Sequence, residues 1–445
     1  MDPNRERVAL TGCGVASGYA AALLATLGVP VERVAGEPDP HPDALWAASG
    51  AMALTGHPGG PPLLAPGPLA ACARGALQAL RALAPNATLP SDGPALLGER
   101  ARFLGITRSG RHAPGGSCRL LRCADGWIAP NLARAEDVAS LPAWLEAPVA
   151  EPTWEAVATL VATRSARELV QRATWLSLPC AIAGPPAAHP PDWLRVERLG
   201  VPAERAPDAH PLVVDLTTLW AGPLTTSLLA AIGARVVKVE STGRPDGARR
   251  GPTEFFDLLN ADKASVALDF RAPADRARLR ALIARADIVV ESARPRALAQ
   301  LGIDARAHVA GQPGRTWLSL TGYGRRDPEP GRVAFGDDAS VAAGLAEATG
   351  RDEGAPLFCG DAIADPLAGL HAALAAAASW RSGGGQLLDL ALRDVVAHAL
   401  AFPSQGDAGF GPTPVRPPRA RAAARPARPL GADTAHVLET LGIRC

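Results

Sequence analysis

The sequence predicts an α/β protein whose main part is a doubly wound parallel sheet, joined to a smaller α/β unit. Strand and helix patterns alternate after residue 211 at the spacing of βαβ units. The chain of 445 residues exceeds one hydrophobic core and is apolar enough to bury two or three. An ungapped internal repeat predicts in addition a degenerate duplication of the sheet.

Residues 1–95 are expected to form a truncated copy of the sheet domain. A strand, a glycine-containing turn and a helix ending at Gly28 are predicted from residue 8, followed by a strand over Val29–Val34. Helices are expected at Trp46–Leu54 and Leu69–Leu83. The glycines of the first turn miss the dinucleotide-binding spacing by one residue, so a nicotinamide cofactor is not indicated.

Residues 96–182 are expected to form the smaller α/β domain. Strand patterns over Cys118–Cys123 and Trp127–Asn131 flank Asp125-Gly126, a hairpin turn. The pair Gly115-Gly116 marks a glycine loop. Helix patterns follow over Ala135–Leu145, Thr153–Ala162 and Ala166–Ala173.

A Pro-rich linker is expected over residues 183–210, before a complete sheet domain over 211–400. Ligands of such a sheet bind at the carboxyl ends of its strands. Residues 401–445 are expected to be an irregular arm with a C-terminal helix. The sheet domain's predicted strands are Leu212–Leu216, Arg235–Val239, Ser265–Asp269, Ile288–Ser292 and Thr316–Leu320, and its predicted helices are Pro223–Ile232, Pro273–Ala284 and Pro295–Leu301.

Two blocks recur in the same order, which predicts the duplication. In the shared register Gly75 stands opposite Gly369, and Ala71 stands opposite Asp365. The first copy therefore lacks the carboxylate that the second copy keeps. The matching blocks are Leu24–Val34 with Leu229–Val239, and Gly50–Leu63 with Gly344–Leu357.

Gly360–His371 is the stretch around which the chain is organised, because it opens a long apolar helix with Asp365-Pro366. Asp caps helices and Pro tolerates the first turn, so a purely structural role is one interpretation. The other is that Asp365 is a carboxylate nucleophile that forms a covalent acyl intermediate. Asp361 is the rival carboxylate, and His371 is interpreted as a core or interface histidine.

The composition of the chain narrows the kinds of partner and cofactor that we expect. A net charge of +1 gives no basic field for nucleic acid, and no apolar run approaches the roughly 20 residues of a membrane span. Seven scattered cysteines without a CxxC pair indicate neither a metal site nor a disulfide framework. We therefore expect a cytoplasmic protein without a metal or a tightly bound cofactor.

Several motifs together resemble the class III CoA-transferases, which include formyl-CoA:oxalate and carnitine CoA-transferases and α-methylacyl-CoA racemase. The resemblance covers residues 211–400 almost continuously and implies a Rossmann-like sheet domain. Residues 97–182 resemble the family's small domain. The motifs are Val214–Thr217 with Ala221–Pro223, Leu229–Glu240, Asn260–Asp269, Ala286–Glu291, Ser319–Gly324 and, at the chain end, Leu430–Gly442.

The resemblance implies that Asp365 attacks an acyl-CoA thioester, giving an aspartyl anhydride and then a thioester, and passes CoA to a carboxylic acid. An aspartate is ionised at neutral pH and needs no base to activate it. The resemblance also implies an active-site loop over Gly115, Gly116 and Ser117. CoA is the substrate, and the positions that match its binding sites are Trp220, Ala221, Leu268, Asp269, Arg271, Ser292 and Arg294.

The chain departs from the family in ways that leave alternatives open. Ser241 and Gln300 stand where the oxalate enzyme has arginines, and Trp220 stands where it has a glutamine. The small domain precedes the complete sheet domain, so the chain is expected to be a pseudo-dimeric monomer or a homodimer. A non-catalytic CoA-binding protein remains an alternative; racemisation is disfavoured because residues 333–338 contain no histidine.

Overall fold

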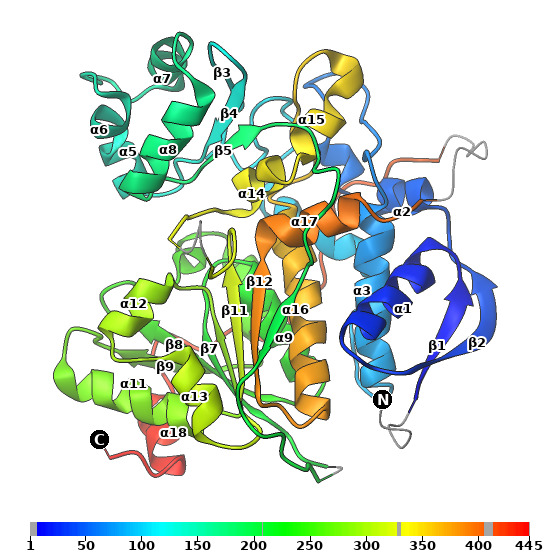
Figure 1. The fold of residues 1–445 in the computed structure, drawn as a ribbon, viewed down its shortest axis with the longest axis vertical. Helices are drawn as coiled ribbons and strands as arrows, with labels where there is room; N and C mark the ends of the chain where they lie inside the picture. The colour runs from blue at the N-terminus through cyan, green and yellow to red at the C-terminus, as the bar shows by residue number, and fades with distance from the viewer. Residues whose placement is uncertain (1–6, 207, 327–330, 405–412, 445) are drawn as a thin grey trace.

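The protein was analysed as a computed structural model, which describes residues 7–444 except 207, 327–330 and 405–412 (Figure 1). Parts of the predicted first copy, linker, sheet domain and arm (1–6, 207, 327–330, 405–412 and 445) thus lie outside the described residues. The described part contains a mostly parallel seven-stranded sheet, a three-stranded sheet and a two-stranded sheet.

The large sheet has the strand order β6-β12-β11-β10-β7-β8-β9, and all its strands except β6 run parallel. From β7 the chain steps outward to β8 and β9, then returns to lay β10 on the other side of β7. The carboxyl ends of β7 and β10 therefore flank the point where the order reverses, which is where such sheets bind ligands. The strands are β6 (Arg195–Arg198), β7 (Leu212–Leu216), β8 (Arg235–Ser241), β9 (Ala264–Leu268), β10 (Ile288–Glu291), β11 (Thr316–Thr321) and β12 (Gln386–Ala391).

Helices cover both faces of this sheet, because successive side chains of a buried strand point to opposite faces. Val213 joins a core with α9 (Ala221–Ala231) and α16 (Ala364–Arg381). Its neighbours Leu212 and Val214 join a core on the other face. The helices of that second core are α11 (Pro273–Arg285), α12 (Pro295–Gln300), α13 (Ala305–Gly311) and α18 (Thr434–Thr440). The remaining helices after the sheet begins are η3 (Gly247–Arg250), α10 (Thr253–Asn260), α14 (Gly336–Ala342), α15 (Leu345–Thr349), η4 (Arg351–Glu353) and α17 (Leu392–Leu400).

The stretch predicted as a linker is more than a connector. Its residues Arg195–Arg198 form β6, which pairs antiparallel with β12 at the sheet edge. Just before β6, Trp193 and Leu194 are buried in the main core. The strand was not predicted because it has only four residues and lies at the sheet edge in a Pro-rich stretch, where so short a pattern carries little information.

The small unit is built on the antiparallel sheet β3-β4-β5, with β3 at Leu121–Arg122, β4 at Trp127–Pro130 and β5 at Cys180–Ala183. The predicted hairpin at Asp125-Gly126 joins β3 and β4. The helix expected over Ala135–Leu145 is divided at Ser140. The helices of the small unit are α5 (Ala135–Ala139), α6 (Leu141–Leu145), α7 (Trp154–Val161) and α8 (Ala166–Leu176).

The N-terminal unit repeats the geometry of the large sheet's first βαβ unit. β1 (Val8–Cys13) and β2 (Val31–Pro38) are parallel and pair Val8 with Val31, while β7 and β8 pair Val213 with Val236. One constant shift in residue number relates the two pairs. The other helices of this unit are α1 (Val15–Thr26), α2 (Pro42–Ser49), η1 (Met52–Leu54), α3 (Leu69–Leu83), η2 (Pro94–Gly98) and α4 (Glu99–Leu104).

Two glycines extend the match to helix packing. A Cβ on Gly75 of α3 would meet the Ala16 carbonyl and Tyr19 of α1. A Cβ on Gly369 of α16 would meet the Ala221 carbonyl and Leu224 of α9. The same shift relates Ala16 to Ala221 and Tyr19 to Leu224, so equivalent positions make equivalent close approaches. In Figure 1 the pairs α1–α3 and α9–α16 lie next to each other.

The C-terminal segment is irregular between 413 and 429, and it packs on the rest of the chain. Arg421 donates to both carboxylate oxygens of the buried Glu99 at 2.7 and 2.9 Å. Asp433 and Thr434 accept hydrogen bonds from backbone N–H groups of the edge strand β9. The segment therefore covers the open edge of the sheet and anchors α4.

Candidate active site

Asp365 lies in the first turn of α16, where it is partly exposed. The residue that precedes the helix is Ile363, and no side chain caps this end. The interpretation of Asp365 as the helix cap is therefore wrong, because the helix begins one residue before it. Its carboxylate instead accepts a hydrogen bond from the backbone N–H of Ala221, at the start of α9. The two helix N-termini thus meet at this carboxylate, and both favour negative charge.

Three further carboxylates surround this position, and all are buried. Asp337 and Asp338 come from α14, and Asp361 comes from the turn before α16. Asp337 accepts a hydrogen bond from the Ala362 N–H at 2.9 Å. Asp338 accepts hydrogen bonds from the Asn131 side chain and the Phe335 N–H. We call Asp337, Asp338, Asp361 and Asp365 the acidic cluster.

Asp361 is held by Arg100 of α4, which the sequence patterns did not indicate. Nε of Arg100 donates to Oδ2 of Asp361 at 2.8 Å, and Nη2 donates to Oδ1 at 2.5 Å. Burial acts to lower the pKa of Arg100, but the Asp361 carboxylate outweighs it and holds that pKa above its usual value. Both oxygens of Asp361 are therefore occupied, whereas Asp365 has no such bidentate partner among the described residues.

Two glycines allow the backbone to pack closely against the side chains of the acidic cluster. A Cβ on Gly115 would lie 2.6 Å from Nη2 of Arg100 and 3.4 Å from Oδ1 of Asp361. A Cβ on Gly336 would overlap Oδ2 of Asp365 and lie 2.5 Å from the Ala362 carbonyl. Gly116 has φ +84° and open space around its Cα. The backbone carbonyl of Ser117 accepts a hydrogen bond from Leu132. Gly115 of the predicted loop thus lies against the Arg100–Asp361 pair.

Burial raises the pKa of Asp365 to about 7, with smaller contributions from neighbouring charges. Among these, Arg100 lowers the pKa, whereas Asp337 and Asp361 raise it. Burial likewise raises the pKa of Asp337 to about 6 and that of Asp338 to about 7. Near neutral pH the acidic cluster therefore contains both protonated and ionised carboxyl groups. Asp365 is a carboxylic acid in some molecules and a nucleophilic carboxylate in others.

The positions matched to CoA line the carboxyl ends of the strands. Trp220 and Ala221 follow β7; Trp220 is buried against Phe255, with ring centroids 5.5 Å apart. Leu268, which ends β9, is buried. After it, Asp269 pairs with the exposed Arg271 at 3.1 Å. After β10, Ser292 is exposed and Arg294 donates to Ser177 of the small unit at 2.7 Å. His371 is buried and hydrogen-bonded to Tyr19, which confirms it as a core histidine.

Arg294, which the resemblance matches to a CoA-binding position, belongs to a group of four arginines. Burial lowers the pKa of Arg294, and the charges of Arg134, Arg296 and Arg244 lower it further. They come from three separate elements: the small unit, the loop after β8 and the region after β10. We call them the basic cluster. Arg271 extends it, because its guanidinium lies about 4.0 Å from the Cβ position of Gly243, next to Arg244.

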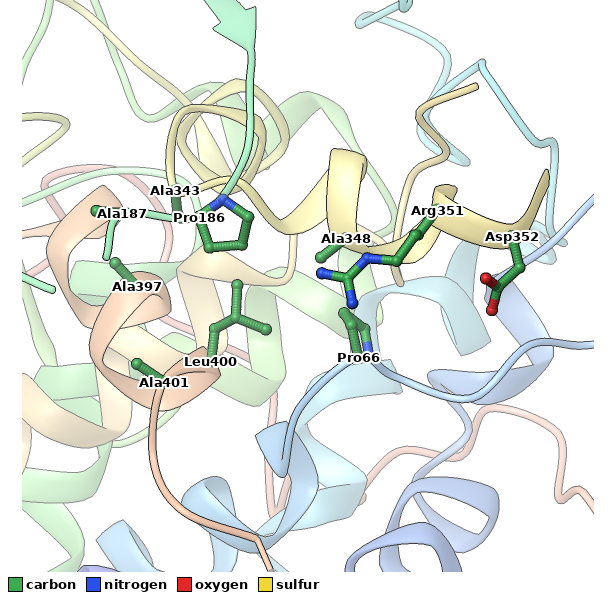
Figure 2. A pocket seen from close by; sticks show the side chains of 10 residues that line it. All are labelled: Pro66, Pro186, Ala187, Ala343, Ala348, Arg351, Asp352, Ala397, Leu400 and Ala401. Atoms are coloured by element: carbon green, nitrogen blue, oxygen red, sulfur yellow. The ribbon is translucent and has the colours of Figure 1, made fainter. Parts of the chain in front are cut away.

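A cavity of about 370 Å³ lies elsewhere (Figure 2). Its walls are mainly alanine and proline, with Arg351 and Asp352 at one side, and none of the predicted site residues lines it. Among the residues with described positions, no group of three or more His, Cys, Asp or Glu side chains could hold a metal ion. The lining residues are Pro66, Pro186, Ala187, Ala343, Ala348, Arg351, Asp352, Ala397, Leu400 and Ala401.

A family model described as CoA-transferase family III matches residues 211–432. Through these residues the chain belongs to that family. The match includes the whole parallel part of the large sheet, α16 with Asp365, and three members of the basic cluster, whereas Arg100, Gly115 and Arg134 lie outside it.

Known relatives each match less than half of the chain. A succinyl-CoA–D-citramalate CoA-transferase of Chloroflexus aurantiacus is 32% identical over 195 residues, 41% of this chain and 48% of its own. A succinate–glutarate CoA-transferase of Agrobacterium fabrum is 29% identical over 233 residues, 48% of this chain and 58% of its own. The crystal structure of a CAIB/BAIF family protein from Brucella suis is 31% identical, with a TM-score of 0.40, over 44% of this chain and 56% of its own.

This chain therefore spans about half the length of the curated relatives it matches. In the described part of this CoA-transferase family III member, no helix has the length and apolar character needed to cross a membrane.

Proposed function

We propose that the protein is a CoA-transferase that moves CoA between an acyl-CoA and a carboxylic acid, with Asp365 as the covalent nucleophile. The observation that carries the proposal is the contrast within the acidic cluster. Asp365 alone of its four carboxylates is partly exposed, whereas Asp361 is fully buried and bound at both oxygens by Arg100. A nucleophile must be reached by its substrate, and Asp365 is the member of the acidic cluster that is partly exposed.

The reaction begins when an Oδ of Asp365 attacks the thioester carbonyl carbon. The C–S bond breaks, CoA leaves as a thiolate, and an aspartyl–acyl anhydride remains. The thiolate then attacks the aspartyl carbonyl and releases the acyl group as a carboxylate, which leaves an aspartyl–CoA thioester. The acceptor acid reverses these two steps. Each attack creates an oxyanion, and N–H groups at the α9 and α16 N-termini and at Gly115-Gly116 are the proposed donors.

The CoA phosphates are proposed to bind across the basic cluster and Arg271. Arginine binds phosphate in a bidentate manner, and four mutually repelling guanidinium groups are stabilised by an anion. The cluster lies beyond the carboxyl ends of β8 and β10, on either side of β7. Besides the basic cluster, which includes Arg294, the proposed CoA contacts are Trp220, Ala221, Leu268, Asp269 and Ser292. The acceptor is proposed to be a carboxylic acid, as the names of the relatives indicate for those proteins.

We further infer that residues 1–95 are a degenerate copy of the sheet domain and that the chain is a pseudo-dimeric monomer. The matching strand registers and the matching glycine contacts of α3 and α16 support this. Ala71 replaces the nucleophile in the first copy, so one active site per chain is expected. The cytoplasm is the proposed compartment, since the described cysteines are all free thiols.

A non-catalytic CoA-binding protein is the second candidate, and Trp220 is the observation that favours it. Trp220 is buried at the start of α9, where its indole packs on Phe255 and lies 5.8 Å from the Arg100 guanidinium. A bulky apolar side chain thus stands where the resemblance implies a glutamine in the oxalate enzyme. The protein would then bind CoA and leave Asp365 unlabelled in the experiment that follows.

Trapping with hydroxylamine tests the nucleophile. We expect incubation with succinyl-CoA or formyl-CoA and hydroxylamine to convert Asp365 into its hydroxamate, measured as a mass change on its peptide. The reactive form is the carboxylate, and the pKa of Asp365 is raised to about 7. Labelling should therefore fall as the pH drops below about 7 and reach its plateau above it. Labelling of another residue, or none with any acyl-CoA, would contradict the proposal.

Charge reversal tests the CoA site. We expect Arg294→Glu and Arg271→Glu each to weaken CoA binding by roughly tenfold or more, because each replaces attraction to a phosphate by repulsion. Titration calorimetry with CoA measures the change. Arg167→Glu is the matched control, since Arg167 is exposed on α8. Equal affinities for all three variants would place the phosphates elsewhere.

A further inference from the structure

Arg100 is the side chain that links the N-terminal part of the chain to the start of α16. It lies on α4, outside the segment that matches the family, and it reaches Asp361 across 261 positions of sequence. α4 is itself anchored from the other side by the bidentate pair of its first residue, Glu99, with Arg421. The short helix α4, which carries Arg100, is thus fixed at its first residue.

The turn that Arg100 holds has an unfavourable backbone. Gly360 has φ +71°, and Ala362 has φ +43°, a left-handed value that strains a residue with a Cβ. Three contacts hold this turn: Gly360 N–H donates to Thr55 at 2.9 Å, Ala362 N–H donates to Asp337 at 2.9 Å, and Arg100 binds Asp361. Two of the three partners, Thr55 and Arg100, precede the family segment. Asp365 lies just after this turn in the sequence, so its position depends on Thr55 and Arg100.

Arg100 also supplies positive charge to a site dominated by carboxylates. The charged groups that act on Asp365 are Asp337 of α14, Asp361 of the turn and Arg100 of α4, with the Ala221 N–H of α9 as a dipole. Arg100 is the one cation among these. Removing it would leave buried carboxylates that repel one another, and such groups take up protons.

We propose that Arg100 is a positioning residue for the reaction at Asp365: it fixes the turn 360–363 through Asp361 and is the positive charge beside the carboxylates of the acidic cluster. Gly115 is needed for the same arrangement, because a side chain at this position would displace Nη2 of Arg100. This inference rests on the proposed function. It adds that the family-matching segment alone is an incomplete site.

Three variants separate charge from position: Arg100→Met, Arg100→Lys and the double variant Arg100→Met with Asp361→Asn. For Arg100→Met we expect the midpoint of the rate–pH profile to rise by about one unit, which lowers the ionised fraction of Asp365 at pH 7 by about fivefold. Its rate should climb again at higher pH but level off below that of the wild type, because methionine does not form the bidentate pair either. Arg100→Lys should keep the midpoint near that of the wild type but react more slowly at every pH, because lysine cannot form the bidentate pair. The double variant removes one charge of each sign, so its midpoint should return toward the wild-type value. An unchanged midpoint in Arg100→Met would overturn the proposal.

A second measurement keeps the test independent of turnover. The protonated-carboxyl infrared band of Asp365, obtained as the difference from Asp365→Asn, can be titrated in wild type and in each variant. Arg100→Met should raise its midpoint whether or not the protein transfers CoA. A shifted band in a protein that never transfers an acyl group would contradict the proposed function and support the role of Arg100. If Arg100→Met does not fold, Arg100→Lys still tests the positioning role, and turnover equal to that of the wild type at every pH in Arg100→Lys would overturn the proposal.

Discussion

Asp365→Asn is expected to reduce acyl transfer by about 10³-fold or more, because an amide oxygen cannot form the anhydride on which each step depends. The change preserves shape, and the side-chain oxygen can still accept the hydrogen bond from Ala221. Steady-state transfer of CoA from succinyl-CoA to a dicarboxylic acid measures the loss. Above about pH 7 the variant should also be more stable than wild type, since it no longer buries a carboxylate whose pKa is raised by that burial.

Asp361→Asn is the matched control for this result. It replaces a second carboxylate of the same size, four residues earlier in the sequence, and leaves the proposed nucleophile in place. We expect slower but measurable transfer, because Arg100 loses its bidentate partner. Full activity in Asp365→Asn together with no activity in Asp361→Asn would move the chemistry to Asp361.

Gly336→Ala has the second-largest expected effect. Its Cβ would overlap Oδ2 of Asp365 and lie 2.5 Å from the Ala362 carbonyl, which belongs to the backbone and has little freedom to move. We expect a loss of about 10² in transfer rate from displacement of the carboxylate. The free energy of unfolding should fall by about 1–3 kcal/mol because of overpacking. Kinetics and urea unfolding of the same preparation measure the two effects.

Gly184→Ala provides the comparison, since no atom lies within 4 Å of its Cβ position. This variant should match wild type in both measurements. Wild-type kinetics in Gly336→Ala would mean that Asp365 is not confined as described, and a purely thermodynamic effect would separate packing at Gly336 from the chemistry.

The strands and helices of the large sheet were predictable because they carry their own patterns. β7, β8, β10 and β11 each begin at the predicted residue, and α3 has the predicted bounds. A buried parallel strand is a continuous apolar run, and an amphipathic helix has a period of its own. β6 was missed because its pairing with β12 depends on a neighbour distant in sequence and not on its own composition.

The candidate site divides in the same way. The sequence by itself determined that a carboxylate opens the apolar helix α16 and that arginines follow the strand ends, because each of these features lies within a few consecutive residues. Only the tertiary structure decided that Arg100 binds Asp361, that Gly115 lies against that pair, and that Arg134 joins Arg294. Ion pairs between residues far apart leave no local pattern, and their partners are chosen by which charges the fold buries together. The choice between Asp361 and Asp365 is therefore a question of burial and pairing that no spacing in the sequence could answer.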